Sequence, residues 1–224
     1  MFIAEMILAP KGVAYWAVTL LLGLAAAAVY LANAPNRTAI DEALGDAAGR
    51  DRPFLGMTAL CGADIAHLLQ THALRPPERL WCYDRSYLES FRNIASAHRT
   101  KFGDTILARY LRPTLIWNDV AFAVFLSLFT ALAAFGLASH ALWPWTSYLM
   151  LAFGCLAIVY GIADVLEDWV LARLLDGSSE IDAAAATAAN TLTRIKLASL
   201  SLSVIGALAF LLFGLIWELV KRIL

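Results

Sequence analysis

Four long apolar runs dominate this sequence of 224 residues, and each is long enough to cross a membrane. We expect spans over residues 12–33, 114–139, 144–174 and about 195–220. Crossing a bilayer core of about 30 Å takes roughly 20 apolar residues of helix. With 61% hydrophobic residues and a mean hydropathy of +0.68, the chain is too apolar for an ordinary soluble domain. The sequence therefore predicts an all-α fold, a bundle of four transmembrane helices.

A polar segment, residues 34–113, separates the first two spans and holds 11 of the 17 basic and 9 of the 18 acidic residues. It predicts a small helical polar cap, so the chain divides into a first transmembrane helix (1–33), the cap (34–113) and a three-helix transmembrane region (114–224). We expect short helices over 38–49 and 64–74.

A third cap helix is predicted to begin at Ser86-x-x-Glu89, which resembles a capping box. Apolar and aromatic residues then recur at steps of three and four, the spacing of an amphipathic helix. They are Tyr87, Phe91, Ile94, His98, Phe102 and Ile106. We expect this stripe to pack inside the cap, with the membrane surface as the alternative.

Acidic charge accumulates in one predicted span only. Asp164, Glu167 and Asp168 share a helix face with Tyr160, because Asp164 lies four residues after Tyr160, and Glu167 and Asp168 lie three and four residues after Asp164. At the bilayer centre each carboxylate costs about 2.5 to 3.5 kcal/mol. The three should therefore lie at the membrane rim or face other protein groups.

Four spans put both termini on one side, side A, and the polar segment and the turn at 175–190 on the other, side B. This topology brings residues from three spans to one depth. The candidate polar rim site comprises Asp119, Tyr160, Asp164, Glu167, Asp168, Thr193, Arg194 and Lys196.

Three interpretations of this site stay open. The acids can pair with Arg112, Arg173, Arg194 and Lys196 and fix the register of the helices. They can form a polar pocket for an ion, a proton or a lipid headgroup, or they can be a solvated helix end. An excess of acids over available bases favours the pocket.

The motifs Asp164-x-x-Glu167-Asp168 and Thr193-x-x-Lys196 resemble those of uncharacterised bacterial four-helix integral membrane proteins. That family has an Asp-x-x-Glu-Asn-like motif on the third span, Thr-x-x-Lys on the fourth, and an Asp at the start of the second, here Asp119. Asp168 stands where the family pattern has Asn. The resemblance covers the second half of the chain, and it implies the fold and a bacterial inner membrane but no activity.

The sequence carries no recognisable catalytic, phosphate-binding or cofactor motif, so we expect no enzyme, no cofactor and no metal site. A net charge of -1 without a basic tract gives no indication of nucleic-acid binding. Small residues on the first and fourth spans favour an accessory or assembly subunit that contacts membrane lipid and a membrane-protein partner or a second copy. The alternative is a small transporter or a lipid- or ion-binding protein that uses Asp164, Glu167 and Asp168.

Orientation rests on two opposing indications. Basic residues near the spans are more numerous on side B, which favours the polar segment in the cytoplasm, and this is the orientation that we expect. If side B is periplasmic instead, Cys61 and Cys82 can form a disulfide.

Overall fold

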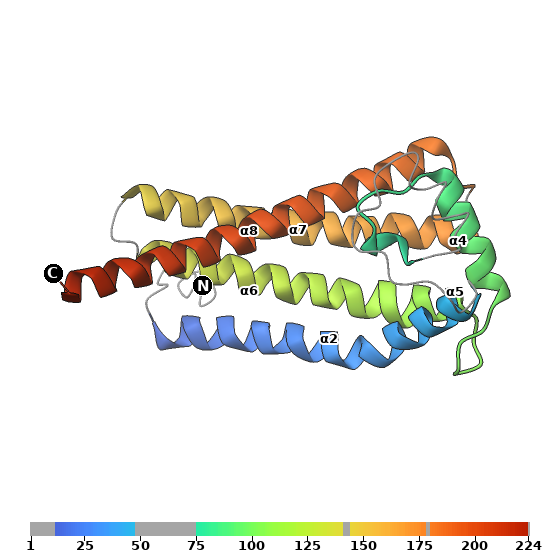
Figure 1. The fold of residues 1–224 in the computed structure, drawn as a ribbon, viewed down its shortest axis with the longest axis horizontal. Helices are drawn as coiled ribbons and strands as arrows, with labels where there is room; N and C mark the ends of the chain where they lie inside the picture. The colour runs from blue at the N-terminus through green and yellow to red at the C-terminus, as the bar shows by residue number, and fades with distance from the viewer. Residues whose placement is uncertain (1–11, 48–74, 141–143, 178–179, 224) are drawn as a thin grey trace, which may run out of the picture.

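The chain folds into a helical bundle, described by a computed structural model over residues 12–47, 75–140, 144–177 and 180–223. Four long stretches of helix run side by side, and a shorter helix lies across one end (Figure 1). Each long stretch contains a segment apolar enough to span a membrane. The predicted all-α bundle of four spans is confirmed, and the chain is an integral, multi-pass membrane protein.

The first span is helix α2, Val13–Ala47, and the second is formed without interruption by α5 (Ile106–Arg109), η2 (Tyr110–Asp119) and α6 (Val120–Ser139). The third is α7, Pro144–Leu175, and the fourth begins α8, Ala183–Ile223. Helix α4, Arg85–Ala97, lies at the end of the bundle where α7 ends and α8 begins (Figure 1). That end is side B.

Large apolar side chains point outward along the spans, where they contact lipid. Examples on three helices are Leu20, Leu24, Leu31, Val124, Leu128, Ile158 and Ile162, all more than a third exposed. Small residues face inward: a Cβ built on Gly161 of α7 would lie 2.6 Å from the Cβ of Ser127 on α6. The two helices therefore pack at a distance that only glycine allows at this position.

The expected helix break after residue 33 is wrong, because α2 continues through Pro35 to Ala47. Proline removes one backbone hydrogen bond from a helix. The Arg37 guanidinium donates to the Tyr30 carbonyl oxygen at 2.8 Å and stacks over the Tyr30 ring, which stabilises the helix around the proline. The continuation of α2 also brings Ile40 into the core of the cap.

Helix α4 begins slightly before the predicted capping box. Its N-cap is Asp84, whose Oδ1 accepts a hydrogen bond from the Tyr87 backbone N–H at 2.9 Å, so Ser86 is not the cap. Asp84 satisfies a backbone donor at the helix start, as a good N-cap residue does.

The predicted stripe is interrupted after α4. The helix ends at Ala97, and the chain turns through Gly103, whose φ of 89° favours glycine, before Thr105 caps α5. Phe102 is consequently 52% exposed, whereas Ile106 is fully buried as part of the next helix. The continuous helix from Ser86 to Ile106 is therefore a wrong prediction.

The cap has a hydrophobic core that it shares with the ends of the spans. Tyr87, Leu88 and Phe91 of α4 pack with residues of η2, α7 and α8. Members of this core from those elements include Tyr110, Leu115, Leu171, Leu175, Ala186 and Ala189. The apolar face of α4 is thus covered by protein, as predicted; the expected helix over 64–74 and Cys61 lie outside the described residues.

Candidate functional site

The predicted acids of α7 lie on its buried face, at the side-B end of the bundle. Asp164 is 6% exposed, Glu167 0% and Asp168 1%, and Tyr160, one turn before Asp164, is 4% exposed. Helical spacing alone puts the three carboxylates on one face. Packing against α8 and η2 takes that face away from solvent.

Lys196 of α8 binds two of these acids. Its Nζ lies 2.7 Å from Asp164 Oδ1 and 2.7 Å from Glu167 Oε2, and the residue is 8% exposed. These are short, charge-assisted contacts in a water-excluded place, where ion pairing is strong and the loss of a partner is costly.

The other oxygen of Glu167 is bound by hydroxyl groups. Thr193 Oγ1 donates to Glu167 Oε1 at 2.5 Å, and the Tyr83 hydroxyl lies 3.0 Å from Thr193 Oγ1 and 3.5 Å from Glu167 Oε1. Burial and the negative charge of Glu167 raise the pKa of Tyr83 well above its ordinary value. Tyr83 therefore keeps its proton and connects the cap to the acids of α7.

Asp168 is different, because neither of its carboxylate oxygens has a hydrogen-bond partner among the described residues. The charges that act on it are those of Asp164, Lys196, Asp119 and Glu167. A buried, unbonded carboxylate beside other acids is costly in its ionised form. Asp168 is the feature of this site that pairing does not explain.

Asp119 reaches the site through an unusual backbone. Residues 110–119 form a π-helix that contains Pro113 and places both Tyr110 and Asp119 near Asp168. In an α-helix of 3.6 residues per turn the two ends of this segment would point in opposite directions. The wider i to i+5 turn, with roughly 4.4 residues per turn, instead puts them on one face.

Three of the four predicted bases do not join the acids. Arg112, Arg173 and Arg194 are all exposed. Arg194 Nη2 lies 3.2 Å from Cys82 Sγ, and the Arg173 guanidinium stacks 3.9 Å from the Trp169 ring centroid. Lys196 is the one that does. We call Asp119, Asp164, Glu167, Asp168 and Lys196 the acidic cluster: four carboxylates against one ammonium, a formal charge of −3 when all are ionised.

Sequence reasoning missed several neighbours of the cluster. Tyr83 comes from the cap, and the Tyr110 hydroxyl donates at 2.5 Å to Glu78, which also pairs with Arg79. Arg79 in turn binds Asp41 of α2 at 2.8 Å. No spacing rule connects these residues to the third span, since they meet only when the cap packs on the bundle.

Cys82 is disulfide-bonded, and its predicted partner Cys61 lies outside the described residues. In the described part of the chain, no group of three His, Cys, Asp or Glu residues is arranged to hold a metal ion. No family model, curated protein or solved structure matches the chain.

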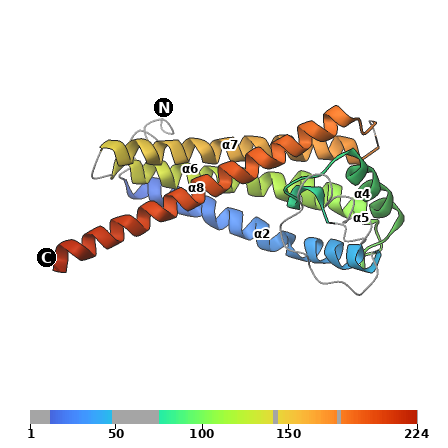
Figure 2. The same ribbon diagram turned by 45° about the horizontal axis from the view of Figure 1, so that its top comes forward.

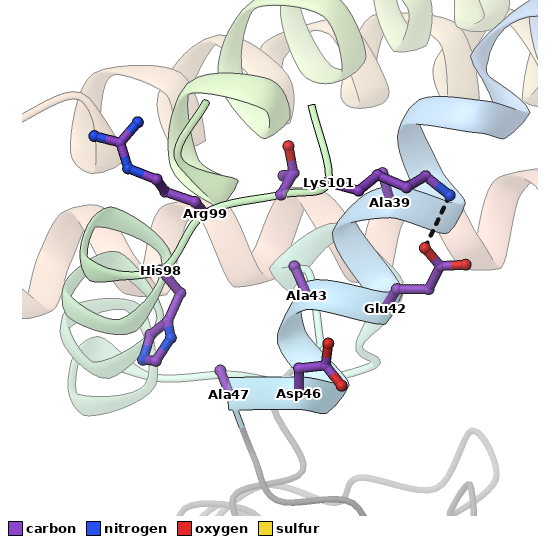
Figure 3. A pocket seen from close by; sticks show the side chains of 9 residues that line it. Ala39, Glu42, Ala43, Asp46, Ala47, His98, Arg99 and Lys101 are labelled. Carbon is purple, nitrogen blue, oxygen red and sulfur yellow. Dashed lines mark hydrogen bonds and ion pairs between the residues drawn. The ribbon is translucent and has the colours of Figure 1, made fainter. Parts of the chain in front are cut away.

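A separate pocket of about 340 Å³ lies on the outside of the cap, between the end of α2 and the turn after α4 (Figure 3). The Glu42 and Lys101 side chains point toward each other across it and form an exposed ion pair of 2.9 Å. The pocket shares no residue with the acidic cluster. The charges of Glu42 and Lys101 are exposed and paired with each other, whereas the acidic cluster is largely buried and holds more acids than bases.

Proposed function

We propose that this membrane protein binds a proton in the acidic cluster, on Asp168, and that proton exchange there is the basis of its activity. The observation that carries the proposal is the unbonded, 1% exposed carboxylate of Asp168 beside three further acids and one lysine. Intramembrane acids that lack a paired base are typical of proton-linked membrane proteins.

The charge balance supports a proton over a purely structural role. Ion pairs that fix helix register require a base for each buried acid, because an uncompensated buried charge costs several kcal/mol. Lys196 binds both Asp164 and Glu167 at 2.7 Å, whereas neither oxygen of Asp168 has a hydrogen-bond partner among the described residues. One proton removes the charge of Asp168 without needing space or ligands.

The test is infrared spectroscopy of the protein in lipid nanodiscs during a pH titration. A protonated carboxyl has a carbonyl stretch that a carboxylate lacks, so the wild-type spectrum should contain one titrating carboxyl band that is missing from the spectrum of Asp168→Asn, isolated by subtracting one spectrum from the other. The matched control is Glu89→Gln, which removes an exposed acid paired with Arg85 and should keep the band. The proposal is overturned if the wild type has no titrating band, or if Asp168→Asn retains it.

Dependence on an inorganic cation is a distinct outcome of the same samples. Thermal unfolding is measured in sodium or potassium chloride against choline chloride at equal ionic strength. A stabilisation by sodium or potassium that Asp168→Asn abolishes would show a metal cation in place of the proton and would overturn the proposal as stated.

Assembly with a membrane partner is the second candidate. The small residues that favoured it are used inside the bundle, since a Cβ on Gly206 would lie 2.3 Å from the Phe153 ring and one on Gly23 2.9 Å from the Phe129 ring. One observation still favours it: the C-terminal part of α8 extends away from the other helices (Figure 2). Leu202 and Ile205, earlier on the same helix, are 58% and 66% exposed. Cysteine crosslinking from Ile205→Cys in native membranes tests it, and a purely monomeric product would count against it.

We also propose that the polar cap faces the oxidising side of a bacterial inner membrane. The disulfide at Cys82 supports this orientation, which is opposite to the one that the count of basic residues predicts. In a Cys155→Ala background, Glu89→Cys should react with a membrane-impermeant maleimide on intact cells. Labelling only after lysis would place the cap in the cytoplasm and contradict the proposal.

A further inference from the structure

We infer that water carries protons to the acidic cluster from side B, along a file of polar side chains that begins at Asp104, before α5, and continues between α2 and η2 to Asp119. The inference rests on the proposed function. It assigns a role in proton access to residues that the site itself does not contain.

The inner half of the file is centred on Asn33, which is 2% exposed at the side-B end of the apolar stretch of α2. Its Nδ2 lies 3.5 Å from Asp119 Oδ1, a long contact, and its Oδ1 accepts from Asn118 Nδ2 at 3.1 Å. A buried amide is costly unless it is bonded. Asn33 therefore lies between the cluster and the next polar group without neutralising the acid.

The outer half runs from Asn36 to the surface. Asn36 Nδ2 donates to Asn33 Oδ1 at 3.3 Å, and Arg109 Nη1 donates to Asn36 Oδ1 at 2.9 Å. Arg109 Nε then binds Asp104 Oδ2 at 2.8 Å. The side chains become more exposed outward, 20% for Arg109 and 34% for Asp104, so the file joins a buried acid to solvent.

The mouth of the file carries a stable negative charge. Burial opposes ionisation of Asp104, but hydrogen bonds from Thr100 and Arg109 outweigh it and lower the pKa of Asp104. The positive charge of Arg109 is neutralised by this carboxylate, so it does not repel protons at the entrance of the file.

Toward side A, the residues that the structure describes form no comparable route. Residues 13–32, 120–163 and 197–209 contain no Asp, Glu, Lys or Arg. Buried hydroxyls in these stretches bond to backbone carbonyls: Thr19 to Tyr15, Ser127 to Ala157 and Ser203 to Phe153. Because these hydroxyls donate to backbone carbonyls of the helices, they do not continue the polar file. We therefore place proton access on side B.

The experiment measures how fast the Asp168 carboxyl band shifts after a film of the nanodisc protein is changed from H2O to D2O. Asn33→Leu keeps the number and branching of the side-chain heavy atoms and removes the polar ones, so exchange should slow by about tenfold or more, equivalent to about 1.4 kcal/mol. The pH at which the band titrates should not change. Ser127→Ala, on the side-A half, should exchange at the wild-type rate.

A second variant guards against misfolding. Asn36 is half-buried, so Asn36→Leu should fold even if Asn33→Leu does not, and it should slow exchange in the same way. Wild-type exchange rates in the asparagine variants, or equal slowing in Ser127→Ala, would overturn the inference while leaving proton binding intact. Absence of the Asp168 band from the wild type would instead overturn the proposed function, and this inference with it.

Discussion

Removal of the one ammonium group of the acidic cluster should destabilise the protein more than removal of any surface lysine. In Lys196→Met the aliphatic part of the side chain is retained, but Asp164 and Glu167 each lose a contact of 2.7 Å. Both acids are then buried without a base, beside Asp168.

The magnitude follows from burial. Breaking a buried ion pair by removing one partner costs about 3 to 5 kcal/mol, because the remaining charge is uncompensated. The control is Lys101→Met, because Lys101 makes a short ion pair that is exposed. Its Nζ lies 2.9 Å from Glu42, and the two side chains are 51% and 56% exposed. Exposed pairs contribute about 0 to 1 kcal/mol.

The assay is reversible unfolding in mixed micelles at neutral pH, followed by tryptophan fluorescence. The triple variant Lys196→Met, Asp164→Asn, Glu167→Gln removes the stranded charges and should recover most of the lost free energy of unfolding. The reasoning is refuted if Lys196→Met loses less than about 1 kcal/mol, as Lys101→Met should, or if the triple variant is no more stable than the single one.

Three further outcomes are expected. Gly161→Leu should weaken the bundle by about 1 to 3 kcal/mol, because its side chain collides with Ser127 on α6, and unfolding in micelles measures this. Tyr83→Phe should cost about 0.5 to 1.5 kcal/mol through the loss of its hydroxyl contacts at Glu167, and should speed proteolysis of the cap. Asp104 has a lowered pKa in the folded state. The stability that its ionised form contributes is therefore complete above the unfolded-state pKa and is lost as the pH falls through the folded-state pKa. Asp104→Asn should remove this part of the acid sensitivity, which is measured as thermal stability against pH.

Each of these has a control on the same chain. A Cβ on Gly45 would meet nothing within 4 Å, and alanine favours a helix over glycine, so Gly45→Ala should cause no loss of stability. Equal losses for both glycine variants would contradict the packing argument. Tyr148 is 72% exposed, so Tyr148→Phe should leave the cap unchanged. An Asp104→Asn protein with the wild-type pH profile would show that the hydrogen bonds of Asp104 do not stabilise the fold.

The spans and the acids of α7 were predictable because they depend on local periodicity. Asp164, Glu167 and Asp168 share a face in any helix, and four apolar runs fix where Asp119 and Lys196 lie in depth. The cap was predicted less well. Separate helices were expected over 12–33 and 38–49, although α2 is continuous from Val13 to Ala47, and Asp84 rather than Ser86 caps α4. Asp84 caps Tyr87, three residues on, and Arg37 binds Tyr30, seven residues back, so both contacts are local. What a local pattern does not contain is the packing of Ile40 in the cap core, which favours a continuous α2.

The sequence by itself determined the membrane bundle, the face that carries the acids and the concentration of charge on side B, because hydrophobicity and helical spacing are properties of the chain alone. Tertiary structure decided which charges meet. Exposed Arg194 and Arg173 contact Cys82 and Trp169, while Lys196 alone turns toward the acids, and a π-helix rotates Asp119 inward. The excess of acid that leaves Asp168 unbonded is therefore a result of packing, since counting residues predicts a nearly balanced ring.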